Sequence, residues 1–139
     1  MAQPIALTPE GETPFAPPCA ADGNAFLRLF HHHIYEYGRG VRALFLLTLN
    51  RAELAVAVAR LQTCGIDHFV QTVCPNKGNL FFGRSAFVDV ARALATRPLN
   101  ALTAEEDFML GALLGYDREQ QCLRYLARSG RAAFATAAE

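Results

Sequence analysis

The chain has 139 residues, the size of one domain, and 52% of them are apolar, which is enough to bury a core. Its 13 basic and 13 acidic residues cancel, which argues against binding to nucleic acid or to an anionic membrane. No apolar run reaches the roughly 18 residues of a membrane span, and the N-terminus does not resemble a secretory signal. We therefore expect a cytoplasmic protein.

The two ends of the chain differ in composition from the part between them. Residues 1–22 contain five prolines and show no periodicity, which predicts a flexible leader. Residues 23–130 are expected to form a single α+β domain, and the alanine-rich residues 131–139 are expected to fray. The cysteines are Cys19, Cys64, Cys74 and Cys122. None forms a C-x-x-C pair, so we expect reduced thiols.

The first half of this domain predicts a helix, a strand and a second helix. Apolar residues recur at three- and four-residue spacing over 24–37, which is typical of a helix. The continuous apolar run 43–49 predicts a strand that is buried on both faces. Asn50-Arg51-Ala52-Glu53 has the form of a capping box and predicts a helix that runs to Gly65.

A hairpin and a third helix follow. Residues 66–73 predict a second strand, 75–78 a turn, and 80–82 a short third strand. Ser85 is expected to cap a helix that extends to Leu94, since a serine hydroxyl can accept a hydrogen bond from the first turn.

Two further helices complete the predicted domain. Thr103-Ala104-Glu105-Glu106 has the form of a second capping box, and Gly115 suits the position after the end of that helix. Asp117 is expected to cap the last helix, with Tyr116 packed as a plug between the two.

These elements predict an α+β fold with a small three-stranded mixed sheet. Its β-α-β-β-α core resembles half of a ferredoxin-like fold, with helices added at the N- and C-terminal ends. The short third strand is expected in the middle, with the first strand beside it. A sheet this small has two unpaired edges, which a symmetric homodimer could cover.

The segment 114–126 holds a cysteine beside an arginine. Arg118 and Cys122 are one helical turn apart, and a neighbouring arginine favours the thiolate. Cys122 lies beyond the first turn of its helix, and the helix dipole acts mainly within that turn. Cys122 also lies on the same helix face as Leu126. We therefore expect Cys122 to be buried as a small hydrophobic residue, with a reactive thiol as the alternative.

The segment HHHIYEY, residues 31–37, raises the question of a metal site. Three consecutive helical residues fan over about 200° and cannot all face one ion. His32 and Glu36 could supply two ligands from one face, and a third would have to come from His68 or a cysteine. No second ligand pair has zinc-type spacing, so we predict no metal and no cofactor.

No catalytic residues are predicted. Glu105, Glu106 and Asp107 fall in the first turn of a helix, where the helix dipole stabilises negative charge, so a capping role is favoured over paired catalytic carboxylates. The sequence has no nucleophile elbow and no Walker motif. An enzyme is therefore the least favoured interpretation, although it stays open.

Four segments together resemble a bacterial family, the domain of unknown function twenty-twenty-three. They are HHIYEY, VRALFLLTL, LFFG and LTAEEDFMLGALLGYDREQQCLRYL. The resemblance covers roughly residues 30–128 and implies an α+β fold with three strands and several helices that dimerises. Family members are often encoded beside flavodoxin genes, which implies a link to redox or iron physiology but no catalytic role.

The resemblance also indicates which positions recur in the family. Within the four segments they are His32, His33, Tyr35, Glu36, Arg42, Gly83, Glu105, Glu106, Asp107, Gly115, Tyr116, Asp117, Arg118, Cys122 and Tyr125. From these we select a candidate functional cluster. Its members are His32, His33, Tyr35, Glu36, Tyr116, Asp117, Arg118, Cys122 and Tyr125.

Three functions remain open at this point. The first is a non-enzymatic accessory protein that acts as a homodimer, with a flavodoxin-type carrier as a candidate partner. Such carriers are acidic, and the arginines to contact one would be Arg39, Arg42, Arg118 and Arg124. The second is a metal- or thiol-based redox-responsive protein that uses Cys122 with the histidines at 31–33. The third is a regulatory module that binds a small ligand in an apolar pocket.

Overall fold

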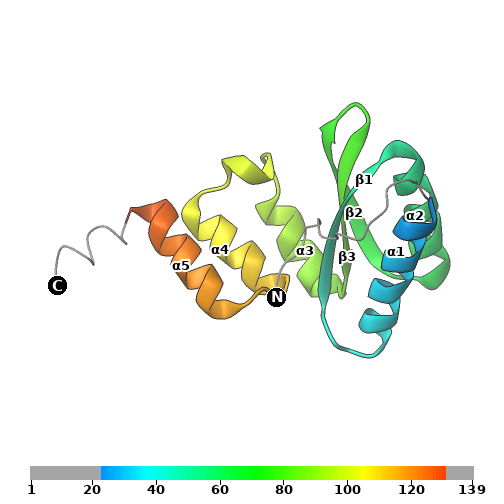
Figure 1. Cartoon of the computed structure of the whole chain (residues 1–139), viewed down its shortest axis with the longest axis horizontal. Coiled ribbons are helices and arrows are strands. Elements are labelled where there is room, and N and C mark those ends of the chain that lie inside the picture. The colour runs from blue at the N-terminus through cyan, green and yellow to red at the C-terminus, as the bar shows by residue number, and fades with distance from the viewer. Residues whose placement is uncertain (1–22, 131–139) are drawn as a thin grey trace.

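The structure is a computed structural model that describes residues 23–130, so the expected leader, the expected tail and Cys19 lie outside the described residues. The elements are α1 (Gly23–Gly38), β1 (Leu44–Asn50), α2 (Arg51–Cys64), β2 (Asp67–Cys74), β3 (Lys77–Gly83), α3 (Ser85–Leu94), the 3₁₀ turn η2 (Leu99–Ala101), α4 (Ala104–Leu113) and α5 (Arg118–Ser129). The predicted α+β order is confirmed (Figure 1). No described helix is both long and apolar enough to cross a membrane.

The three strands form one sheet in the order β1-β3-β2. The prediction that the third strand lies in the middle is confirmed, but the sheet is antiparallel rather than mixed. β3 pairs with β1 through partners such as Phe45 and Phe82, and with β2 through partners such as Val70 and Leu80. Because β3 separates β1 from β2, those two strands never form the parallel ladder that a mixed sheet requires.

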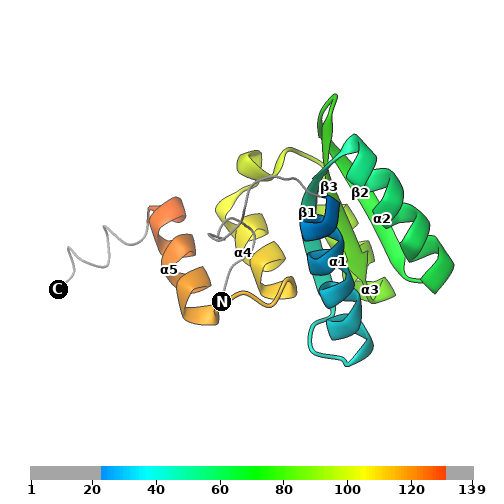
Figure 2. The same ribbon diagram turned by 45° about the vertical axis from the view of Figure 1, so that its right-hand side comes forward.

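Helices cover both faces of the sheet (Figures 1 and 2). On one face α1 and α2 pack over a cluster of buried residues that includes Phe30, Phe45, Leu61 and Phe82. On the other face α3 and α4 pack over a second cluster, whose centre includes Phe81. α5 lies beyond α4, as an outer layer away from the sheet.

A series of side-chain hydrogen bonds crosses all three strands. Thr48 Oγ1 on β1 lies 2.7 Å from Asn79 Oδ1 on β3, and Asn79 Nδ2 donates to Gln71 Oε1 on β2 at 3.0 Å. Gln71 Nε2 in turn donates to the carbonyl oxygen of Arg97 at 2.7 Å. Asn79 is only 6% exposed, so these bonds satisfy a buried amide that a shift of register would leave without partners.

The two predicted capping boxes are confirmed, but the third cap is not. Asn50 accepts from the Glu53 amide at 2.8 Å, and Thr103 accepts from the Glu106 amide at 3.1 Å. Arg84 rather than Ser85 precedes α3, and it makes no side-chain cap. The Ser85 hydroxyl instead donates to Asp67, which joins the start of α3 to the start of β2.

β1 is less deeply buried than predicted. Leu44, Phe45 and Leu49 are buried, whereas Leu46 and Leu47 are half-buried and Thr48 is exposed. The continuous apolar run resembles a strand of a parallel sheet, but β1 is an outer strand that pairs with β3 on one side only among the described residues.

Gly83 at the end of β3 is required by a close approach of two backbones. Its φ is 154°, and a Cβ there would overlap the carbonyl oxygen of Ala43. Arg84 N donates to the same oxygen at 2.9 Å, so the approach is fixed by a hydrogen bond.

We predict that Gly83→Ala lowers the free energy of unfolding by about 3 kcal/mol, because the added methyl group meets backbone and the φ is unfavourable. Chemical denaturation measures this change. Gly38→Ala is the matched control, since nothing lies within 4 Å of a Cβ at Gly38. Equal stabilities of the two variants would contradict the prediction.

Candidate functional site

Three polar side chains meet where α1 leads into β1. His33 and Glu36 lie on the last turns of α1, and Gly40, with a φ of 74°, reverses the chain so that Arg42 folds back on them. Arg42 Nη2 donates to Glu36 Oε1 at 3.3 Å, and His33 Nδ1 lies 3.3 Å from the same oxygen. We call His33, Glu36 and Arg42 the junction cluster.

Aromatic packing holds the junction cluster against the sheet. The Arg42 guanidinium carbon lies 4.6 Å from the centre of the Phe45 ring, and the His33 ring centre lies 5.1 Å from it. On its other side Arg42 faces Gly115, where a Cβ would lie 3.5 Å from Arg42 Cδ. The cluster therefore joins α1, β1 and the turn between α4 and α5.

Burial makes His33 a neutral imidazole. Desolvation, with a further contribution from the Arg42 charge, lowers the pKa of His33 to about 4, although its hydrogen bond to Glu36 acts in the opposite direction. The pKa of Glu36 is lowered: its burial opposes this, but the hydrogen bonds and charges of His33 and Arg42 outweigh that burial. His33 Nδ1 lies 3.3 Å from both Glu36 Oε1 and Arg42 Nη2. Depending on the tautomer, the neutral ring donates to the carboxylate or accepts from the guanidinium.

Tyr116 fills the space between the α4–α5 turn and the sheet, as predicted. It is half-buried and packs against the core cluster under α3 and α4. Desolvation raises the pKa of its phenol well above the ordinary value, so the hydroxyl stays protonated at neutral pH. Such a phenol is a poor general base, which favours a packing role.

The polar residues of α4 and α5 clamp these two helices together. Asp107 accepts from Arg124 Nε at 2.6 Å and lies 3.0 Å from Arg128 Nη1. The Tyr125 hydroxyl donates to Glu105 at 3.2 Å. Glu106 closes the capping box of α4, which confirms the expected capping role for this residue, whereas Glu105 and Asp107 bind side chains of α5.

Gly111 lets α5 approach α4 closely. The side chain of Gln121 is buried against Gly111, and a Cβ on that glycine would overlap the Gln121 amide.

Asp117, Arg118 and Cys122 do not join the junction cluster. Asp117 caps α5 by accepting from the Gln120 amide at 2.8 Å, which confirms its predicted role. Arg118 is exposed. Cys122 is also exposed, so the prediction that it is buried is wrong. The face of α5 that packs on α4 carries Gln121, Tyr125 and Arg128, one position away from the apolar stripe that the sequence suggested.

The remaining members of the predicted cluster lie on the outer surface of α1. His32 Nε2 is 3.6 Å from Glu36 Oε2, and the His32 side chain is 62% exposed. Tyr35 is exposed and accepts from Arg39 Nη1 at 3.3 Å. The structure thus separates the predicted cluster into an α1 part and an α4–α5 part, which meet only through Arg42 and the turn at Gly115 and Tyr116.

Residues 23–130 contain no group of three or more histidine, cysteine or acidic side chains placed to hold a metal ion. Cys122 is on α5 and the three histidines are on α1, and both views place these helices on opposite sides of the sheet (Figures 1 and 2). The described residues therefore do not bring Cys122 and these histidines together as ligands of one ion. The thiol-based form of this hypothesis stays a prediction, and Cys122 is exposed.

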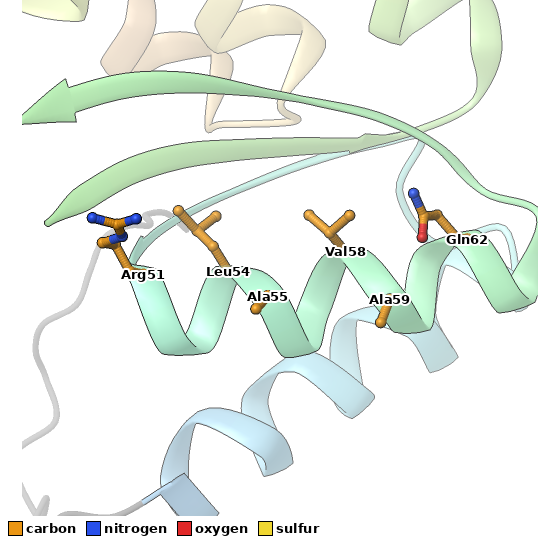
Figure 3. A pocket seen from close by; sticks show the side chains of 6 residues that line it. All are labelled: Arg51, Leu54, Ala55, Val58, Ala59 and Gln62. Atoms are coloured by element: carbon orange, nitrogen blue, oxygen red, sulfur yellow. The ribbon is translucent and has the colours of Figure 1, made fainter. Parts of the chain in front are cut away.

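A hollow of about 420 Å³ runs along α2 (Figure 3). Leu54 and Val58 point from the helix toward the strands, and Arg51 and Gln62 mark its two ends. All of its lining residues come from one helix, so it is a surface groove that cannot enclose a small ligand. It does not have the form that the small-ligand hypothesis requires.

Sequence reasoning missed several polar contacts that position these elements. Gln121 and Arg128 were not singled out, although Arg128 Nη2 donates to the carbonyl oxygen of Leu102 at 2.9 Å. Asn79 falls between the predicted turn and the predicted third strand, whereas in the structure it lies within β3 and its side chain donates to Gln71. One signal for the face of α5 that packs on α4 was present in the sequence. It is the four- and three-residue spacing of Gln121, Tyr125 and Arg128, which places them on one helix face.

We predict that the free energy of unfolding falls by up to about 3 kcal/mol as the pH drops from 6.5 toward 4, because the unfolded chain protonates His33 in that range and the folded chain does not. Denaturant unfolding at pH 7 and pH 4.5 measures this loss. His33→Gln should flatten the pH dependence, whereas His32→Gln, at the exposed neighbouring position, should leave it unchanged. A His33→Gln variant with the parent's pH dependence would contradict the pKa assignment.

Asp107→Asn should lower the free energy of unfolding by about 1–2 kcal/mol, since it removes one carboxylate that serves two arginines and is itself only 15% exposed. Thermal and denaturant unfolding both measure the change. Glu119→Gln on the exposed surface of α5 is the control. If Asp107→Asn leaves the free energy of unfolding unchanged, the ion pairs of Asp107 with α5 contribute no stability.

One family model matches residues 28–128, and its description is "Protein of unknown function (DUF2023)". No curated protein matches the sequence. The matched range contains β1, β2, β3, the junction cluster and the α4–α5 clamp, and it covers well over half of the chain. The chain therefore belongs to the DUF2023 family of proteins of unknown function.

Proposed function

We propose that this protein is a non-enzymatic accessory protein of the bacterial cytoplasm that acts through protein contacts as a homodimer. The observation that carries the proposal is a three-stranded sheet whose two outer strands, among residues 23–130, each have one edge without a strand partner. Unpaired strand edges present free backbone donors and acceptors, and proteins either protect such edges or use them for pairing.

The roles of the polar side chains support this function over catalysis. The junction cluster joins α1 to β1, and the Asp107 clamp joins α4 to α5. His33 is the histidine with the most strongly perturbed pKa, and it is held among an arginine, a carboxylate and a phenylalanine ring. Burial, together with the Arg42 charge, accounts for the lowered pKa of His33 without a substrate, although Glu36 acts in the opposite direction.

The cysteines support the proposed compartment. Cys64, Cys74 and Cys122 are exposed and free within residues 23–130. Exposed thiols stay reduced in a cytoplasm and would be at risk of oxidation outside it.

A flavodoxin-type carrier is the partner class that we propose on the family resemblance. Arg42 contacts Gly115, so the C-terminal end of α1 and the start of α5 lie at the same end of the molecule. Arg39 and Arg118 are exposed there, whereas Arg42 and Arg124 are bound to Glu36 and Asp107. An acidic partner would therefore contact Arg39 and Arg118 first.

Sedimentation equilibrium of the full-length protein tests the homodimer. We expect a concentration-dependent dimer in the micromolar range, since edge pairing adds main-chain hydrogen bonds to a modest apolar contact. A protein that sediments as a monomer at every concentration would contradict the proposed function.

Binding to a flavodoxin tests the partner separately. We expect an affinity that falls with ionic strength and that weakens roughly tenfold in Arg39→Glu/Arg118→Glu. Arg28→Glu, at the other end of α1, is the control and should bind as the parent does. No salt-dependent binding by the parent protein would remove this partner and leave the dimer untouched.

A further inference from the structure

The two edges of the sheet are not equally available for pairing. β1 contains three buried residues, whereas β2 contains none. Residues 68–72 of β2 form a regular stretch without lysine or proline, residues that commonly protect an edge from pairing, and a β-bulge follows between Thr72 and Cys74. Val70 and Val73 on β2 are 41% and 54% exposed.

One hollow lies along α2, and a second borders the start of β2. The groove on α2 extends from Arg51 to Gln62 beside the strands, as Figure 3 shows. A second hollow is lined by Gln62, Asp67 and His68 at the start of β2 and by Asp89 and Arg92 of α3. A strand added beside β2 would place alternate side chains toward the α2 side and the α3 side of the sheet.

Opposite charges mark the two ends of this edge. Asp67 and Asp89 lie at the start of β2, where Arg92 pairs with Asp89 at 2.9 Å. At the other end Lys77 pairs in register with Cys74, and Arg51 closes the α2 groove. An antiparallel pair of identical strands brings the start of each strand to the end of the other, so this edge is complementary to itself.

We propose that the β2 edge is the homodimer interface, and that a second copy adds its own β2 antiparallel to it. The two sheets then join into one six-stranded sheet around a two-fold axis near the middle of β2. Arg51 and Lys77 of each copy approach Asp67 and Asp89 of the other, and the exposed valines are buried between them. This inference specifies the contact for the homodimer of the proposed function and rests on it.

Charge reversal and mixing test the interface. Arg51→Glu/Lys77→Glu makes both ends of the edge acidic, and Asp89→Lys removes the acidic character of the other end. Each variant alone should dimerise at least roughly tenfold more weakly than the parent, because like charges meet twice in a symmetric dimer. An equimolar mixture of the two should recover the parent's affinity, since opposite charges then meet at both ends.

Sedimentation equilibrium and native mass spectrometry of the full-length proteins read out these affinities and identify the mixed dimer. Arg60→Glu, which changes an exposed arginine of α2 outside the groove, is the matched control and should dimerise as the parent does. Circular dichroism confirms that each variant is folded.

Each outcome decides the inference. One contradicting outcome is that the parent dimerises and both charge-reversed variants dimerise as tightly as it does. Another is that the mixture of the two variants does not recover the parent's affinity. In either case the copies meet elsewhere, so the interface is overturned while the homodimer stands. If the parent is a monomer throughout, the β2 edge does not pair two copies of this chain. That result overturns both the interface and the proposed homodimer.

Discussion

The fold depends on burying both faces of β3. Leu80, Phe81 and Phe82 are each fully buried, and successive residues of a strand point to opposite faces. Phe82 packs on Phe30 and Phe45 under α1 and α2, whereas Phe81 stacks on Phe69 under α3 and α4. A central strand of this kind requires a partner on each side and a helical layer on each face, which fixes most of the architecture.

The same constraint explains where the conspicuous polar residues lie. Once the two helical layers are in place, the chain must pass from α1 to β1 and from α4 to α5 at the ends of the sheet. Arg42 stabilises the first passage through Glu36 and Phe45. Asp107 joins the far ends of α4 and α5 through Arg124 and Arg128. The polar cluster that the sequence suggested as one site is thus two structural junctions, joined where Arg42 meets Gly115.

Local signals in the sequence predicted the elements well. The capping boxes at Asn50 and Thr103 and the glycine after α4 act within a few residues, so the sequence contains all that is needed to recognise them. The face of α5 that packs on α4 could not be predicted from such local signals. Its contact with α4 consists of Gln121, Tyr125 and Arg128, and apolar periodicity pointed instead to Cys122 and Leu126. The mixed-sheet prediction failed because strand order depends on tertiary packing.

We propose that the protein presents a sheet edge to its partner rather than a cavity, and β2 is the more exposed of the two outer strands. Hydrogen–deuterium exchange of the full-length protein, recorded at increasing protein concentration, tests this directly. We expect the outward amides of β2 to become protected as the concentration rises, while those of β1 do not change. Protection that appears on β1 instead, or on neither edge, would contradict the account.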